Sequence, residues 1–112
     1  MSLDLSVLEQ LKQDFGDDDF EGLLDQIVND AVNLMSCLET AAENDDIPAT
    51  RRAAHALRGL CGQFGFLDAA RALEKVEDGP EAAVNRDAVE VLAECTRVLV
   101  VIREKYDIAW KN

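Results

Sequence analysis

The sequence has very few of the residues from which metal sites and catalytic dyads are built. Its 112 residues include one histidine, three cysteines, one tryptophan and two prolines. The cysteines are far apart and form no C-x-x-C pair: Cys37, Cys61 and Cys95. Each lies within an apolar helical pattern, which is typical of small buried hydrophobic residues in a reducing cytoplasm. We therefore expect neither a disulfide nor a cysteine-bound metal.

Other absences narrow the class of protein further. No apolar run is long enough to span a membrane, and the N-terminus lacks the basic and apolar regions of a signal peptide. There is no glycine-rich nucleotide loop and no room for an ATP-binding domain. A Cys–His or Ser–His catalytic pair would have to use His55, and Cys61 points about 120° away from it on a helix. We expect a cytoplasmic protein that is not itself an enzyme.

Positive charge is scarce and unevenly distributed. The chain has 23 acidic and 11 basic residues, which gives a net charge of −12. Residues 1–50 hold 13 acids and one base, whereas residues 51–112 hold 10 of each. This excess of negative charge argues against binding to nucleic acid or to an anionic membrane surface. One stretch, residues 47–65, stands out because it has three arginines and no acid.

Helical periodicity is what the sequence has in quantity. Hydrophobic residues make up 48% of the chain, and they recur at spacings of three and four along five segments. These segments predict helices over residues 4–15, 18–44, 47–65, 67–77 and 85–106. Short connections favour antiparallel neighbours. We therefore expect a single all-α domain over residues 1–112, an antiparallel up-and-down four-helix bundle with a short additional N-terminal helix.

Glycine, aspartate and proline mark the predicted helix ends. Gly16 is expected to end the first helix, and one of the aspartates at 17–19 to cap the second. Pro48 suits the first turn of the third helix, and Asp78-Gly79-Pro80 is the clearest turn. Trp110 either packs on the end of the bundle or lies exposed beyond it.

The only histidine lies in the middle of the acid-poor third helix. At about 100° per residue, His55 is opposite the apolar residues of that helix and should face water. The predicted inward stripe is Ala53, Leu57, Leu60 and Phe64. Five residues lie within roughly 60° of His55 on the outer side: Arg51, Arg52, Arg58, Gly59 and Gly62.

This combination of side chains suits phosphoryl transfer. Neutral imidazole is a good nucleophile near its reference pKa of about 6.5. Guanidinium groups stabilise the negative charge of a phosphoryl group, and most of the remaining work is positioning. A glycine within a helix costs about 1 kcal/mol relative to alanine. Gly59 and Gly62 are more readily accepted if another molecule must approach the backbone beside His55.

Simpler explanations exist for each feature taken alone. A lone histidine is usually a structural residue. Arg51 and Arg52 are ordinary solvated charges that could pair with an acid on the second helix. The two glycines could serve close helix packing. The functional interpretation depends on all these features lying on one strip opposite an apolar stripe.

The stretch A-H-A-L-R-G-L-C-G-Q-F-G, residues 54–65, resembles the signature of histidine-containing phosphotransfer (Hpt) domains. That signature reads roughly A-H-x-L-K-G-small-small-x-x-apolar-G, followed by an apolar helix that ends in L-E. Here Leu73-Glu74 and Val76-Glu77 supply the ending. Residues 20–46 are similar to the long helix of the family, and the resemblance covers about residues 17–105.

The resemblance implies a phosphocarrier in a multistep phosphorelay of two-component signalling. His55 would accept a phosphoryl group, through Nε2, from a histidine kinase or a receiver-domain aspartate and pass it to another response-regulator receiver. Arg58 would balance the phosphoryl charge, and Gly59 would let the receiver approach. The position of Arg51, Arg52, Gly62 and Gln63 on the helix suggests that they line the docking surface. The Mg²⁺ of the reaction would be held by the receiver, so no cofactor or metal is expected in this chain.

Two residues depart from the family signature, and other functions remain open. Arg58 replaces a lysine, and Leu60 stands where a small residue is commoner, although the helical wheel places it inward. The alternative function is a docking module that regulates a receiver or kinase without carrying phosphate. A structural bundle without a signalling role is a third possibility. The apolar stripes are all accounted for inside the predicted bundle, which favours a monomer. An N-terminal methionine followed by a complete bundle favours a free-standing protein.

Overall fold

The computed structural model describes residues 3–106, and these residues form helices and short connections with no strand. The prediction of an all-α fold is therefore confirmed. Within the described part, the elements are α1 (Ser6–Phe15), α2 (Asp17–Glu43), α3 (Ile47–Gln63), α4 (Leu67–Asp78), the 3-10 turn η1 (Glu81–Ala83) and α5 (Val84–Tyr106). None of these helices is both long and apolar enough to span a bilayer. Trp110 lies outside the described residues.

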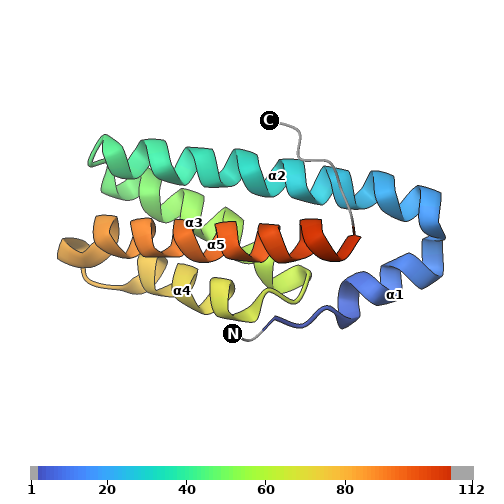
Figure 1. The fold of residues 1–112 in the computed structure, drawn as a ribbon. Coiled ribbons are helices and arrows are strands. Elements are labelled where there is room, and N and C mark those ends of the chain that lie inside the picture. Colours follow the sequence, from blue (N-terminus) through green and yellow to red (C-terminus); the bar gives the residue numbers. More distant parts are fainter. Residues whose placement is uncertain (1–2, 107–112) are drawn as a thin grey trace.

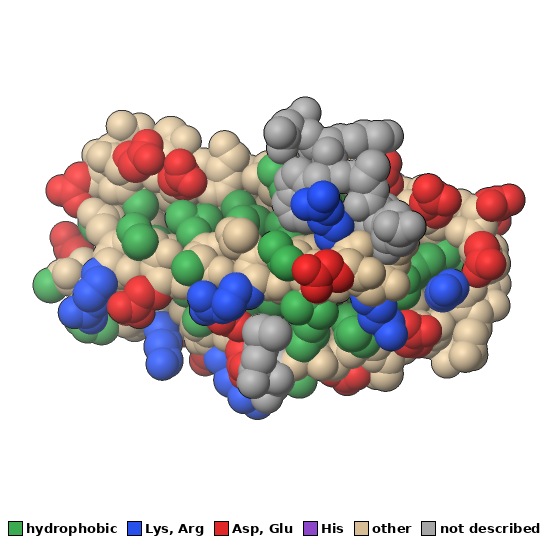
Figure 2. Space-filling view, viewed as in Figure 1, with side chains coloured by type: hydrophobic (Ala, Val, Ile, Leu, Met, Phe, Trp, Pro, Cys, Tyr) green, Lys and Arg blue, Asp and Glu red, His purple; other side chains and the backbone are tan. Residues whose placement is uncertain are grey.

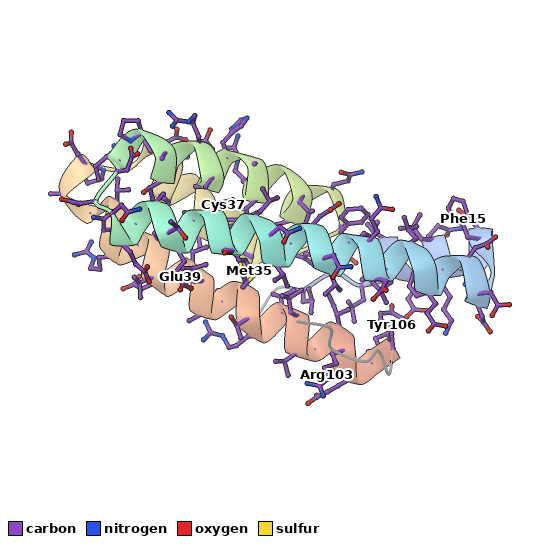
Figure 3. All side chains as sticks on the ribbon, turned by 90° about the horizontal axis from the view of Figure 1, so that it is seen from above. Phe15, Met35, Cys37, Glu39, Arg103 and Tyr106 are labelled. Carbon is purple, nitrogen blue, oxygen red and sulfur yellow. The ribbon has the colours of Figure 1, made fainter. Side chains whose placement is uncertain are left out.

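Helices α2 to α5 form a four-helix bundle. Each of them packs against the next, and α5 packs back on α2 to complete the ring. Figure 1 shows that successive helices run in opposite directions and that α1 extends from one end of the bundle, beside the start of α2. At that end the Tyr106 hydroxyl donates to Glu9 Oε1 at 2.7 Å and its ring meets Phe20 edge-on (Figure 3). The hydrogen bond to Glu9 joins α1 to α5, and the ring contact with Phe20 joins α5 to α2.

The junction between α1 and α2 differs from the predicted one. Gly16, at φ 80°, ends α1 and is also the N-cap of α2, which has no side-chain cap. The prediction that an aspartate caps α2 is therefore wrong. Glycine adopts a positive φ at little cost, so the chain reverses within one residue and the aspartates at 17–19 fall inside the first turn. Their charge still favours the positive end of the helix dipole.

The α2–α3 connection is equally short. The N–H of Asp46 donates to Ala41 O at 3.0 Å and that of Asp45 to Ala42 O at 3.1 Å, the pattern of a Schellman motif. Asp45 takes the left-handed position at φ 55°. Asp46 then caps α3, because its Oδ1 accepts from the Ala49 N–H at 3.1 Å. One motif thus ends α2 and starts the helix that carries His55.

The buried face of α3 is rotated from the predicted one. Leu57 is buried as expected, but Ala53, Leu60 and Phe64 are only half-buried. The residues buried beside Leu57 are instead small ones: Thr50, Ala54 and Cys61. Small side chains allow close helix approach, and α4 packs against α3. The rotation turns one edge of the His55 strip toward α4.

The cysteines only partly follow the prediction. Cys61 and Cys95 are buried, but Cys37 is exposed on α2, so its predicted burial is wrong (Figure 3). Among the larger apolar side chains of the described residues, Phe15, Leu67, Val89 and Val100 are also exposed. Figure 2 shows hydrophobic side chains along the seam between α2 and α5. The monomeric state stays a prediction.

Gly65 shapes the turn between α3 and α4. It has a φ of 86°, and the following N–H, of Phe66, donates to Cys61 O at 2.8 Å, which again forms a Schellman motif. The Gly65 carbonyl accepts from the Asp4 N–H at 2.9 Å. A Cβ at this position would lie 2.2 Å from Asp4 O. Only glycine therefore fits both the turn and the N-terminal segment that crosses it.

We predict that Gly65→Ala lowers the free energy of unfolding by at least about 2 kcal/mol, because strained φ and steric conflict act together. Chemical denaturation monitored by circular dichroism measures this. The matched control is Gly22→Ala, since Gly22 lies in α2 with open space around its Cβ position. That control should gain up to about 1 kcal/mol. Equal stability of Gly65→Ala and the wild type would contradict this account of the turn.

Candidate functional site

His55 faces water from the middle of α3, as the sequence predicts. Its side chain is 67% exposed. Its Nδ1 lies 2.5 Å from Oε1 of Glu77, a residue near the end of α4. The imidazole is therefore held at one nitrogen and open to solvent around the rest of the ring.

Glu77 is held by three residues of α3, which lie at positions 51, 55 and 58. Its Oε1 meets His55, and its Oε2 lies 3.2 Å from Arg58 Nε in an ion pair without the alignment of a hydrogen bond. The Glu77 backbone carbonyl accepts from Arg51 Nη1 at 2.6 Å. The side chain is only 19% exposed, so most water is excluded from around the carboxylate.

The contact with Glu77 determines which nitrogen of His55 carries the proton. An ionised carboxylate accepts hydrogen bonds and donates none. The proton of a neutral imidazole in this contact is therefore on Nδ1, and the lone pair is on Nε2. Nε2 is thus the nucleophilic atom, and it is on the side of the ring away from Glu77.

The arginines around His55 divide into two groups. Arg51 and Arg58 lie on the edge of the strip that faces α4, and both turn toward Glu77. Arg52, on the opposite edge, is exposed. The simpler explanation in which Arg51 pairs with an acid on α2 does not hold, because Arg51 donates to backbone carbonyls of α4. The reason is the rotation of α3, which brings this edge against α4.

The glycines beside His55 are open to solvent. Gly59 and Gly62 are both exposed, and a Cβ built on either would have no neighbour within 4 Å. Close helix packing therefore does not explain them. Gln63 is exposed at the end of the same helix. The surface next to the imidazole consequently has bare backbone at two positions.

The buried cysteines offer no competing nucleophile. A hydrogen bond with Cys95 and burial together raise the pKa of the Cys61 thiol above its usual range. The same bond lowers the pKa of Cys95. Both thiols lie in the core, where an attacking group cannot reach them. His55 is therefore the exposed nucleophilic side chain of α3, whereas the exposed thiol of Cys37 lies on α2.

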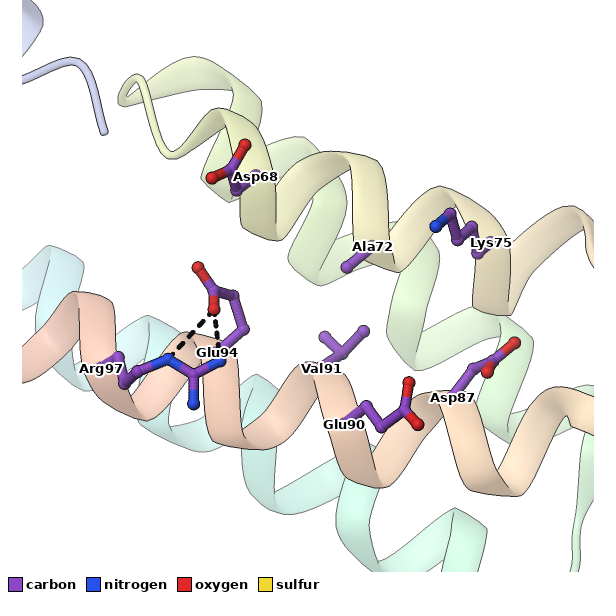
Figure 4. Close-up of a pocket in the computed structure, with 8 residues that line it drawn as sticks. All are labelled: Asp68, Ala72, Lys75, Asp87, Glu90, Val91, Glu94 and Arg97. Carbon is purple, nitrogen blue, oxygen red and sulfur yellow. Dashed lines mark hydrogen bonds and ion pairs between the residues drawn. The ribbon is translucent and has the colours of Figure 1, made fainter. Parts of the chain in front are cut away.

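A groove on another side of the bundle has no comparable chemistry. It lies between α4 and α5 and is lined by charged side chains of both signs, with Glu94 and Arg97 paired to each other on its α5 side (Figure 4). Lys75 and Asp68 line it from the α4 side, and neither His55 nor Glu77 is among its lining residues. Within residues 3–106, no group of three or more histidine, cysteine or acidic residues has an arrangement that would hold a metal.

A family comparison identifies the class of protein. The family model of the Hpt domain matches residues 22–101, which include His55 and all of its partners described above. The chain belongs to the Hpt domain family. Comparisons with curated proteins and with solved structures gave no significant match. Hpt domains are phosphocarriers rather than enzymes, and they interact with kinases and receiver domains. This Hpt domain therefore has a phosphotransfer role in two-component signalling.

Glu77 is a site residue that the helical pattern of the sequence does not reveal, although the spacing of residues around Gly65 points to it. His55 lies ten residues before Gly65 and Glu77 twelve residues after it. In an antiparallel helix pair, both are then about 15–18 Å from the turn at 1.5 Å per residue. In the sequence, Val76-Glu77 stands only at the end of the family signature. Residues at equal distances from the Gly65 turn lie side by side in two antiparallel helices. This rule places the Glu77 carboxylate beside the His55 imidazole.

We predict that Gly59→Ala raises the free energy of unfolding by up to about 1 kcal/mol, because the methyl group meets open space and alanine favours the helix. Thermal and chemical denaturation of the isolated protein measure this. Gly62→Ala is the matched variant and should change stability in the same direction. A loss of stability in Gly59→Ala would mean that this glycine is needed for packing.

Proposed function

We propose that His55 is the phosphoacceptor of a phosphorelay intermediate. It takes a phosphoryl group from a histidine kinase or from a receiver-domain aspartyl phosphate and passes it to an aspartate of another response-regulator receiver. The observation that carries this proposal is the Nδ1 contact with Glu77, which leaves the Nε2 lone pair exposed. The protein acts as a carrier, and the Mg²⁺ of the reaction belongs to the partner receiver.

The transfer step follows from this tautomer. The Nε2 lone pair attacks phosphorus, the P–O bond to the donor aspartate breaks, and the donor leaves as a carboxylate. The proton on Nδ1 stays in place throughout. Because the ring becomes positively charged as the N–P bond forms, the hydrogen bond to the Glu77 carboxylate strengthens during the reaction. Transfer to the next receiver reverses these events.

Arg58 balances the charge of the bound phosphoryl group. Glu77 approaches its Nε, so the terminal nitrogens are directed away from that contact. Its side chain is 34% exposed, which leaves the guanidinium accessible. A forked guanidinium suits phosphoryl oxygens better than a point charge does. The replacement of the usual lysine by arginine is therefore compatible with the role.

The receiver docks over the exposed side of α3. Gly59 and Gly62 let its surface approach the backbone, and Arg52 and Gln63 border this area. We further propose that the protein acts as a monomer in the cytoplasm. The free thiols of Cys61 and Cys95, which are in hydrogen-bond contact, suit a reducing compartment.

We predict that His55→Gln abolishes phosphorylation. The wild type should acquire acid-labile, base-stable phosphate from phosphorylated receivers or kinases of its source organism, and the variant should show only background. Radiolabel transfer followed by acid and base treatment measures this. Label on the variant, or none on the wild type from any donor, would eliminate the phosphoacceptor proposal. Binding of a receiver without label would favour the docking module.

We predict that Gly59→Glu blocks transfer from a phosphorylated receiver but not phosphorylation by a small donor such as phosphoramidate. The new side chain obstructs docking while leaving the imidazole accessible. Transfer from the receiver should fall at least tenfold, with helical content and melting temperature nearly unchanged. Gly22→Glu, on exposed α2 surface, is the matched control. Wild-type transfer by Gly59→Glu would place the docking surface elsewhere.

A further inference from the structure

Arg51 makes contacts that differ from those of the other cations on the His55 strip. Its Nη1 donates to Glu77 O at 2.6 Å and lies 3.4 Å from Val76 O. Its side chain is half-buried between α3 and α4. The guanidinium is thus committed to the backbone of α4 and does not point toward an incoming partner.

These contacts cap the C-terminal end of α4. The last four carbonyls of an α-helix have no partner within the helix. Lys75 O is satisfied by the Gly79 N–H at 2.8 Å, and Arg51 supplies a donor to the next two carbonyls. A cation also suits the negative end of the helix dipole. Arg51 therefore fixes the last turn of α4, which includes Glu77.

We infer that Arg51 is a positioning residue for phosphoryl transfer, which acts by holding Glu77 against Nδ1 of His55. This inference rests on the proposed role of His55 as phosphoacceptor. It changes the role expected from the sequence, where Arg51 was placed on the docking surface. Arg51 touches neither the imidazole nor the place of the phosphoryl group in the proposed reaction.

The geometry explains why the carboxylate needs this support. Glu77 is the second-last residue of α4, where helices fray and the backbone is held by few hydrogen bonds. A small displacement of this turn would lengthen the 2.5 Å contact with Nδ1 and release the imidazole to exchange tautomers. Arg51 is one helical turn before His55 on α3, so the backbone and the carboxylate of Glu77 are both held by the same helix.

The test compares Arg51→Met with Arg71→Met. Methionine keeps the apolar stem and removes the donors. Arg71 is an exposed arginine of α4 whose ion pair is with Asp68, so its replacement changes the net charge equally. His55 is the only histidine, so the nitrogen-15 shifts of one imidazole report its tautomer at alkaline pH, where the ring is neutral. Phosphorylation by phosphoramidate measures reactivity without docking.

We predict that Arg51→Met lowers both the Nδ1–H fraction and the phosphorylation rate, the latter by about three- to tenfold. Arg71→Met should match the wild type in both. Arg51→Lys restores a charged donor and should recover much of the lost reactivity. If Arg51→Met does not fold, Arg51→Lys is compared with the wild type in its place. A change in melting temperature with unchanged tautomer and rate would show a purely structural role and overturn the inference.

The two proposals fail separately. If the wild type accepts no phosphoryl group from any donor, the proposed function fails, whereas the tautomer comparison still decides whether Arg51 positions Glu77. If the wild type is phosphorylated but Arg51→Met keeps its tautomer and rate, only the positioning inference is overturned.

Discussion

The chain reversal at Gly65 is the constraint on which the site depends. Because Gly65 takes a positive φ and the Phe66 N–H returns to α3, α4 runs back along the helix that carries His55. Small buried residues on α3 let the two helices approach closely. The end of α4 then lies beside the imidazole, and Glu77 meets His55 without any loop being involved. The site is therefore built on two packed helices, which hold side chains more accurately than loops do.

The shared carboxylate changes the electrostatics of the strip. The sequence suggests a purely cationic surface around His55, but Glu77 introduces a negative charge and engages two of the three arginines. Ion pairs of this kind at a partly exposed surface add only roughly 0–1 kcal/mol to stability. Their effect is positional: the imidazole has a defined tautomer before any partner arrives. The net negative charge of the protein comes instead from residues 1–50, which hold 13 acids and one base.

The parts of the fold that were predictable are those determined by local pattern. Helical spacing of apolar residues located all five α-helices of the described part to within about three residues, and the all-α class followed. The rotation of α3 was not predictable, because the helical wheel favours large apolar residues as the inner face. In the folded protein the small residues Thr50, Ala54 and Cys61 are buried instead, because the positions of the neighbouring helices decide which side of α3 is covered. The exposure of Cys37 has the same kind of cause, since its pattern does not say which side of α2 has a neighbour.

The sequence by itself determined that the single histidine faces water and that two glycines lie beside it. A single histidine opposite an apolar stripe, with glycines on the same side, specifies a water-facing imidazole from helical geometry alone. Only the tertiary structure decided the chemical state of that imidazole and the separate roles of its arginines. Those depend on Glu77, which is 22 residues away in the chain and reaches His55 only because two helices pack antiparallel. Periodicity acts within a helix, whereas a hydrogen bond between helices depends on their rotation and separation, which packing sets.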